Sequence, residues 1–101
     1  MKLSGEVAII TGGARGIGKS VAEAFVREGA KVVIASEIKD ELIAASSDLD
    51  VDYIKTDVTK IEDVRDLIDF TVSKFGRIDI LINAAGRQIP VGSVIDVDAE
   101  A

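Results

Sequence analysis

The hydrophobic residues of this chain gather in four short runs, separated by longer stretches in which apolar positions recur at helical spacing. The runs are rich in Val and Ile and nearly continuous, as is typical of strands covered on both faces of a parallel sheet. They predict strands at 7–10, 31–36, 50–57 and 78–83. The stretches between them predict helices at 19–29 and 38–48, and a third helix that follows Thr59 and ends at Gly76.

The second and third helices differ in the strength of their local signals. Thr59 and Glu62 have the spacing of a capping box, in which each side chain binds a free backbone N–H group at the start of the helix. The second helix has a weaker pattern, with Leu42, Ile43 and Ala45 predicted to share its apolar side. We therefore expect the third helix to be the best formed of the three.

A glycine-rich turn after the first strand matches the P-loop of nucleotide hydrolases. Residues 13–20 fit the pattern G-x-x-x-x-G-K-[ST], in which Lys19 would reach the β- and γ-phosphates and Ser20 would hold Mg²⁺. A P-loop protein also needs a second strand that ends in Asp near the Mg²⁺ ion. The most apolar strand of this chain ends in Asn83 instead. The P-loop NTPase is therefore the less favoured interpretation.

The same turn also has a spacing found in dinucleotide-binding proteins. Gly12, Gly16 and Gly18 lie between a strand and a helix, although Val21 stands where the third glycine of G-x-G-x-x-G would be. Such a turn directs backbone N–H groups and a helix N-terminus at a phosphate. A dinucleotide site also needs an acidic residue about 20 residues further on, after the second strand, to bind the ribose hydroxyls. Glu37 follows Gly18 by 19 residues, so the dinucleotide interpretation is favoured.

The order of these elements predicts an α/β fold. Strands alternate with helices along the whole chain, which is typical of a doubly wound parallel sheet with right-handed crossovers. With a phosphate-binding first turn, the expected strand order is 3-2-1-4. We therefore expect residues 1–101 to form one partial Rossmann-like domain, truncated before a second half.

Composition and charge exclude several classes of function. The 101 residues include neither cysteine nor histidine, so disulfides and the commonest metal ligands are absent, and no metal site is predicted. A net charge of −6 argues against binding to nucleic acid. No apolar run approaches the roughly 20 residues needed to span a bilayer. Residues 1–6 lack the apolar region of a signal peptide, so a cytoplasmic protein is expected.

Three linked motifs together resemble the N-terminal half of a short-chain dehydrogenase/reductase. They are the glycine turn at 11–18, the pair Asp57-Val58, and the segment Asp79-x-Leu81-x-Asn83-Ala84-Ala85-Gly86. The resemblance covers nearly the whole chain in the family's order and spacing. It implies an oxidoreductase that transfers hydride between NAD(P) and an alcohol or ketone.

The resemblance also implies which residues hold the cofactor. The pyrophosphate would be framed by Gly12, Gly16, Ile17 and Gly18. The adenine would contact Asp57 and Val58. The wall beside the adenosine ribose and the nicotinamide would be formed by Asn83, Ala84, Ala85 and Gly86. Ala84 replaces the second Asn of the family's usual Asn-Asn-Ala-Gly motif, which removes one side-chain hydrogen bond.

Two of these residues also have purely structural interpretations, which the sequence leaves open. Asp57 could contact the adenine, or could instead share the capping of the third helix with Thr59. Asn83 could stabilise the loop at the centre of the sheet, which is a structural role even within the family.

The choice between NAD and NADP depends on the end of the second strand. In the family, an acidic residue there selects NAD, because it repels the 2′-phosphate that NADP enzymes pair with Arg. At the end of the second strand, Ser36 occupies the position of that acidic residue, and Glu37 is the next residue along the chain. Arg15 in the glycine turn would favour NADP. We expect NAD, with NADP as the alternative.

The family's chemistry requires residues that this sequence does not contain. The resemblance implies a Tyr-x-x-x-Lys pair and a Ser, and residues 1–101 hold no Tyr-x-x-x-Lys. We therefore name no catalytic residue and expect the isolated chain to be inactive. The strand at 78–83 would leave an exposed apolar edge, which predicts a homo-oligomer or a complex with a complementary fragment. The alternative is a non-enzymatic nucleotide-binding or interaction protein that retains the half-fold.

Overall fold

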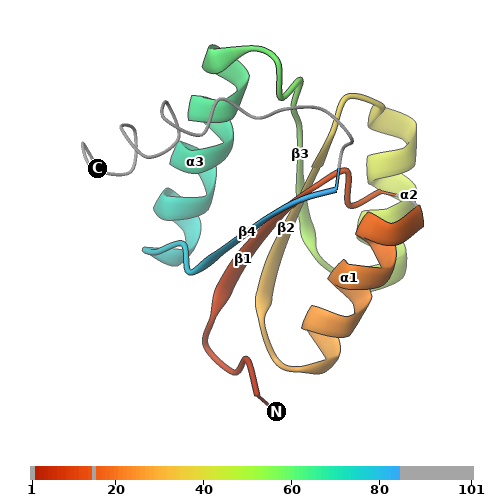
Figure 1. Cartoon of the computed structure of the whole chain (residues 1–101), viewed down its shortest axis with the longest axis vertical. Coiled ribbons are helices and arrows are strands. Elements are labelled where there is room, and N and C mark those ends of the chain that lie inside the picture. The colour runs from red at the N-terminus through yellow and green to blue at the C-terminus, as the bar shows by residue number, and fades with distance from the viewer. Residues whose placement is uncertain (1, 15, 85–101) are drawn as a thin grey trace.

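The computed structural model describes residues 2–14 and 16–84, in which strands and helices alternate (Figure 1). The elements in chain order are β1 (Val7–Thr11), α1 (Gly16–Arg27), β2 (Lys31–Ser36), α2 (Lys39–Leu49), β3 (Asp52–Lys55), α3 (Ile61–Phe75) and β4 (Ile80–Asn83). Of the residues assigned to the predicted site, Arg15, Ala85 and Gly86 lie outside the described residues, as does the chain beyond them.

The four strands form one parallel sheet in the order β3-β2-β1-β4, which confirms the predicted fold class and strand order. In the register of the sheet, Thr11 at the end of β1 lies beside Ala35 of β2 and Asn83 of β4. Ser36, the last residue of β2, lies beside Lys55, the last residue of β3. The carboxyl ends of all four strands therefore meet along one edge of the sheet.

Helices cover the sheet on both faces, with α1 and α2 on one side and α3 on the other (Figure 1). Alternate residues of the strands supply two hydrophobic clusters, because successive side chains of a strand point to opposite faces. One cluster contains Ile10, Val32, Ile34, Ala22, Leu42 and Ala45. The other contains Ile9, Val33, Ala35, Leu67 and Ile68. Burying a large side chain of this kind contributes about 1.5–3 kcal/mol.

The observed bounds differ from the predicted ones mainly at the element ends. Helix α1 begins at Gly16 rather than Lys19, so that part of the glycine turn already belongs to the helix. Strand β3 begins at Asp52, because Asp50 adopts a left-handed conformation, with a φ of 55°, as the C-cap of α2. Helix α3 ends where predicted, with Gly76 as its C-cap at a φ of 81°.

The predicted capping box of α3 is wrong. The N-cap residue is Lys60, which makes no side-chain capping bond. The hydroxyl and backbone N–H of Thr59 both donate to Oδ1 of Asp57, at 2.6 and 2.9 Å. The residue that reaches back from the first turn is Asp63 and not Glu62, and its Oδ2 accepts the N–H of Asp57 at 2.8 Å. The Asp57 carboxylate thus accepts the hydrogen bond from the Thr59 N–H that Glu62 was expected to accept.

Two apolar residues are more exposed than their patterns predicted. Leu42 and Ala45 are buried as expected, but Ile43 is 44% exposed, because it lies about 100° around the helix from Leu42. Leu81 of β4 pairs with Ile9 and shares its face of the sheet, yet is 39% exposed. In the described part of the chain, β4 is therefore not covered on both faces. None of the described helices is long and apolar enough to cross a membrane.

Candidate functional site

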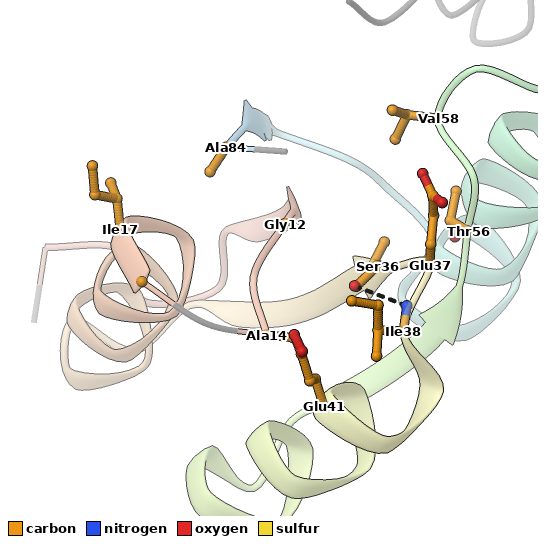
Figure 2. Close-up of a pocket in the computed structure, with 12 residues that line it drawn as sticks. Gly12, Ala14, Ile17, Ser36, Glu37, Ile38, Glu41, Thr56, Val58 and Ala84 are labelled. Atoms are coloured by element: carbon orange, nitrogen blue, oxygen red, sulfur yellow. Dashed lines mark hydrogen bonds between the residues drawn. The ribbon is translucent and has the colours of Figure 1, made fainter. Parts of the chain in front are cut away.

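A pocket of about 450 Å³ lies at the carboxyl ends of the strands, and each strand end contributes to its wall (Figure 2). The β1–α1 turn supplies Gly12, Ala14, Gly16 and Ile17. The end of β2 and the start of α2 supply Ala35, Ser36, Glu37, Ile38 and Glu41. The ends of β3 and β4 supply Thr56, Val58 and Ala84. In doubly wound folds this is where ligands bind, since the strand order reverses direction here, between β1 and β4.

The β1–α1 turn has the geometry of an anion-binding loop. Gly12 and Gly16 have φ values of 72° and 59°, a region that L side chains rarely adopt. The turn leads directly into α1, whose first-turn N–H groups have no partners within the helix. The first turn of α1 holds no acidic residue, whereas those of α2 and α3 hold Asp40, Glu41, Glu62 and Asp63. No acidic side chain of the first turn therefore neutralises the positive end of the α1 dipole.

Gly18 packs against the backbone of the turn and is not part of the pocket wall. A Cβ atom on Gly18 would come within 2.0 Å of the carbonyl oxygen of Gly12 and 3.2 Å of the Cβ of Ala84. Glycine is needed here because the first turn of α1 packs directly on the backbone of the turn. Ile17, the next residue before it, is 81% exposed and offers an apolar surface at the mouth of the pocket.

The end of β2 and the start of α2 bring two carboxylate side chains to the pocket. The predicted residues Ser36 and Glu37 both line it, and the Ser36 Oγ accepts the N–H of Ile38 at 3.2 Å (Figure 2). Glu41, from the first turn of α2, also lines it and was not predicted. Among the described lining residues there is no Lys or Arg, so the charged side chains there are all acidic.

The end of β3 contributes Val58 rather than Asp57. Val58 is 4% exposed and lines the pocket together with Thr56, which was not a predicted site residue. The Asp57 carboxylate is directed at Thr59, as described above, and is not part of the wall. Thr59 is the residue before the N-cap of α3, so these hydrogen bonds lie within the loop that precedes the helix.

The end of β4 is held to β1 through a buried threonine. The Thr11 hydroxyl donates to Oδ1 of Asn83 at 2.9 Å, and the Thr11 carbonyl oxygen accepts the N–H of Ala84 at 2.9 Å. These bonds place Ala84 in the wall, while Asn83 stays outside it. Thr11 was not predicted as a site residue, although its place directly before the glycines was the available signal.

Lys19, the residue a P-loop would direct at phosphates, contacts the neighbouring helix instead. Its Nζ lies 2.7 Å from Oδ2 of Asp48 on α2, and it does not line the pocket. The hydrogen bond from the Lys19 ammonium group, together with its charge, lowers the pKa of the Asp48 carboxyl. The P-loop interpretation is therefore not favoured. Within residues 2–14 and 16–84, no group of three acidic residues is placed to hold a metal ion.

Comparison with known proteins relates this chain to the short-chain dehydrogenases. The family model described as short chain dehydrogenase matches residues 6–101. Short-chain dehydrogenase reductase 5 of Arabidopsis thaliana is 42% identical over 99% of this chain and 40% of its own length. Tropinone reductase-like 1 of Erythroxylum coca is 52% identical over 84% of this chain and 32% of its own length.

Solved structures of short-chain dehydrogenases also resemble this chain. A short chain dehydrogenase from Bacillus anthracis superposes with a TM-score of 0.79 at 40% identity, covering 82% of this chain and 35% of that protein. The chain thus spans two fifths or less of the length of these relatives. Since the family model matches almost every residue and the sheet has the family's strand order, this chain belongs to the short-chain dehydrogenase/reductase family, whose members use NAD or NADP.

Proposed function

We propose that this chain binds NAD in the pocket at the carboxyl ends of its strands. In this proposal it is the nucleotide-binding part of an oxidoreductase that moves hydride between the cofactor and an alcohol or ketone. The observation that supports this most strongly is the composition of the pocket wall. A glycine turn suited to a pyrophosphate lies on one side, and the carboxylates that follow β2 lie on the other.

Each part of the dinucleotide has a matching region of the wall. The pyrophosphate would lie on the backbone of Gly12 and Gly16, against the start of α1. The adenosine ribose would lie at the end of β2, where the Glu37 carboxylate accepts hydrogen bonds from its hydroxyls. The adenine would pack against the apolar side chain of Val58. Ala84 would line the path toward the nicotinamide.

The charges of the pocket favour NAD over NADP. The 2′-phosphate of NADP carries between one and two negative charges at neutral pH, and it needs a cationic partner. Among the described residues of the wall, the charged ones are Glu37 and Glu41. A carboxylate can accept hydrogen bonds from a ribose hydroxyl but repels a phosphate.

Calorimetric titration with NADH, NADPH and ATP·Mg²⁺ tests this proposal. We expect NADH to bind more tightly than NADPH, and ATP·Mg²⁺ to bind more weakly than either. Glu37→Gln should weaken NADH binding by about tenfold, because hydrogen bonds to a charged group contribute about 1.5–3 kcal/mol. Glu62→Gln on the exposed start of α3 is the matched control. Absence of NADH binding by the wild-type chain would refute the proposal.

The exposed edge of β4 supports a further proposal about partners. Among the described residues, β4 pairs along one side only, with β1, and its Leu81 is 39% exposed. A second copy of the chain, or a complementary segment, would satisfy the open edge. Sedimentation velocity at micromolar concentration should show a species larger than a monomer. A well-folded monomer under these conditions would contradict this part of the proposal.

A further inference from the structure

Glu41 lies in the wall of the pocket at a position where a phosphate would otherwise be favoured. It is the third residue of α2, so its side chain leaves the helix within the first turn. In the view of Figure 2, its carboxylate lies on the side of Ala14, and that of Glu37 lies toward Thr56 and Val58. Two negative charges therefore enter the pocket from different sides of the β2–α2 junction.

The start of α2 is an anion-attracting point of the pocket wall. The N-cap residue Ile38 makes no side-chain capping bond, and it lines the pocket. Free N–H groups and the positive end of the helix dipole favour a negative charge there. A phosphate on the ribose 2′-oxygen would approach this end of α2, because the ribose binds at the end of β2. Without an acidic side chain in this wall, the helix start would help to hold that phosphate.

We propose that Glu41 is a second specificity-determining residue, which disfavours nucleotides that carry a 2′-phosphate. This inference rests on the proposed binding of NAD in the same pocket. Glu37 and Glu41 have different roles in it. Glu37 accepts hydrogen bonds from the ribose hydroxyls, whereas Glu41 acts through its negative charge, which opposes the phosphate at the start of α2.

The neighbouring residue Asp40 provides a matched control. Asp40 and Glu41 both add one negative charge to the first turn of α2. Asp40 is exposed and does not line the pocket, whereas Glu41 does. If the overall charge of the helix start controlled the preference, the two residues would be equivalent. If charges in the pocket wall control the preference for NADH over NADPH, only the substitution of Glu41 should change it clearly.

The experiment measures the dissociation constants of NADPH and NADH for the wild type, Glu41→Gln and Asp40→Asn by calorimetry. We expect Glu41→Gln to lower the ratio of the NADPH constant to the NADH constant by about threefold to fivefold, as for removal of one partly exposed charge. Asp40→Asn should change it by less than about twofold. The effect of Glu41→Gln should shrink at 1 M salt, where the Debye length falls to about 3 Å. Glu41→Lys should lower the ratio further.

The outcomes separate this inference from the proposed function. An unchanged ratio in both Glu41 variants would overturn the inference while leaving NAD binding intact. Equal decreases in Asp40→Asn and Glu41→Gln would also overturn it, because the helix charge as a whole would then be the cause. If the wild-type chain binds no NADH, the proposed function fails, and the inference fails with it.

Discussion

Gly18 lies directly against Gly12, so closely that a Cβ atom on Gly18 would come within 2.0 Å of the Gly12 carbonyl oxygen. The contact is between backbone groups, which cannot move aside as the end of a flexible side chain can. It places the start of α1 against the turn that follows β1. Because both residues belong to the predicted cofactor turn, this contact connects the packing of the fold with the shape of the site.

Gly18→Ala should therefore destabilise the protein and also remove nucleotide binding. We expect a loss of at least about 2 kcal/mol in the free energy of unfolding, since overpacking against a backbone cannot be relieved locally. Urea denaturation and titration with NADH measure the two effects. An alanine variant that kept wild-type stability and wild-type affinity would show that this contact is not required.

Gly16→Ala separates the shape of the turn from its packing. Gly16 has a positive φ, and a Cβ atom added there would meet no atom within 4 Å. The same is true of Gly5, which precedes the amino end of β1, whereas the pocket lies at the carboxyl end. Each alanine substitution should cost about 1 kcal/mol of stability, because of the left-handed conformation. Only Gly16→Ala should weaken NADH binding as well, and Gly5→Ala is its control. Equal affinities in the two variants would argue against a phosphate at this turn.

Asp79 should make the stability of the sheet depend on pH. Its Oδ1 accepts a hydrogen bond from Nε of Arg77 at 3.0 Å, and its Oδ2 accepts one from the N–H of Val7 at 2.8 Å. The Arg77 hydrogen bond, followed by that from Val7, lowers the pKa of the Asp79 carboxyl below its usual value. A lowered pKa in the folded state stabilises the protein above the unfolded pKa, near 3.9, and this stability is lost as the pH falls below it.

The measurement is urea denaturation of the wild type and Asp79→Asn between pH 3 and pH 7. Asp79→Asn should be less stable than the wild type at pH 7, and the difference should narrow toward pH 3. Asp69→Asn, on the exposed side of α3, is the control and should show no such change. A difference that stays constant over this pH range would contradict the assigned role of the Asp79 carboxylate.

Asp50 is a position where a substitution should increase stability. It ends α2 in a left-handed conformation, with φ and ψ of 55° and 54°. Its carboxylate also lies at the negative end of the helix dipole. Asp50→Gly should raise the free energy of unfolding by about 0.5–1 kcal/mol, because glycine adopts this conformation without strain. Asp50→Ala, which removes the same charge but keeps a Cβ, should give no such increase in a thermal melt.

Lys19→Ala tests the rejected P-loop interpretation. The substitution removes the ion pair with Asp48, which is solvent-exposed, so the stability should fall by less than about 1 kcal/mol. NADH binding should not change, because Lys19 lies outside the pocket wall. Tight binding of ATP·Mg²⁺ that disappears in this variant would favour the P-loop interpretation instead.

Much of the fold was predictable because strong local signals agree with one another. Continuous apolar strands such as β2, the glycine turn after β1 and the stop at Gly76 each point to the observed topology. The details that were wrong depend on competition between neighbours. The Asp57 carboxylate, and not that of Glu62, accepts the hydrogen bond from the N–H of Thr59. The spacing of the residues alone does not show which of the two carboxylates lies nearer to that N–H group.

The site was predictable where the backbone defines it and less so where side chains do. Gly12, Gly16 and Ala84 belong to turns whose place follows from the topology, and they line the pocket. Glu41 reaches the same pocket because α2 starts three residues after the end of β2 and carries the Glu41 carboxylate on the side of Ala14. That direction depends on how α2 packs on the sheet, which the sequence pattern of this weaker helix did not define.

The contribution of all four strand ends to one pocket has a thermodynamic consequence. A nucleotide that needs every strand end binds only the completely ordered sheet, so a ligand at 100 times its dissociation constant adds about 2.7 kcal/mol to the free energy of unfolding. Conversely, a change that loosens any one strand lowers the population that can bind and raises the apparent dissociation constant in proportion. The affinity for NADH should therefore fall when any strand of the sheet is loosened, even by substitutions outside the pocket wall. Asp50, shortly before β3, and Asp79, directly before β4, are such positions.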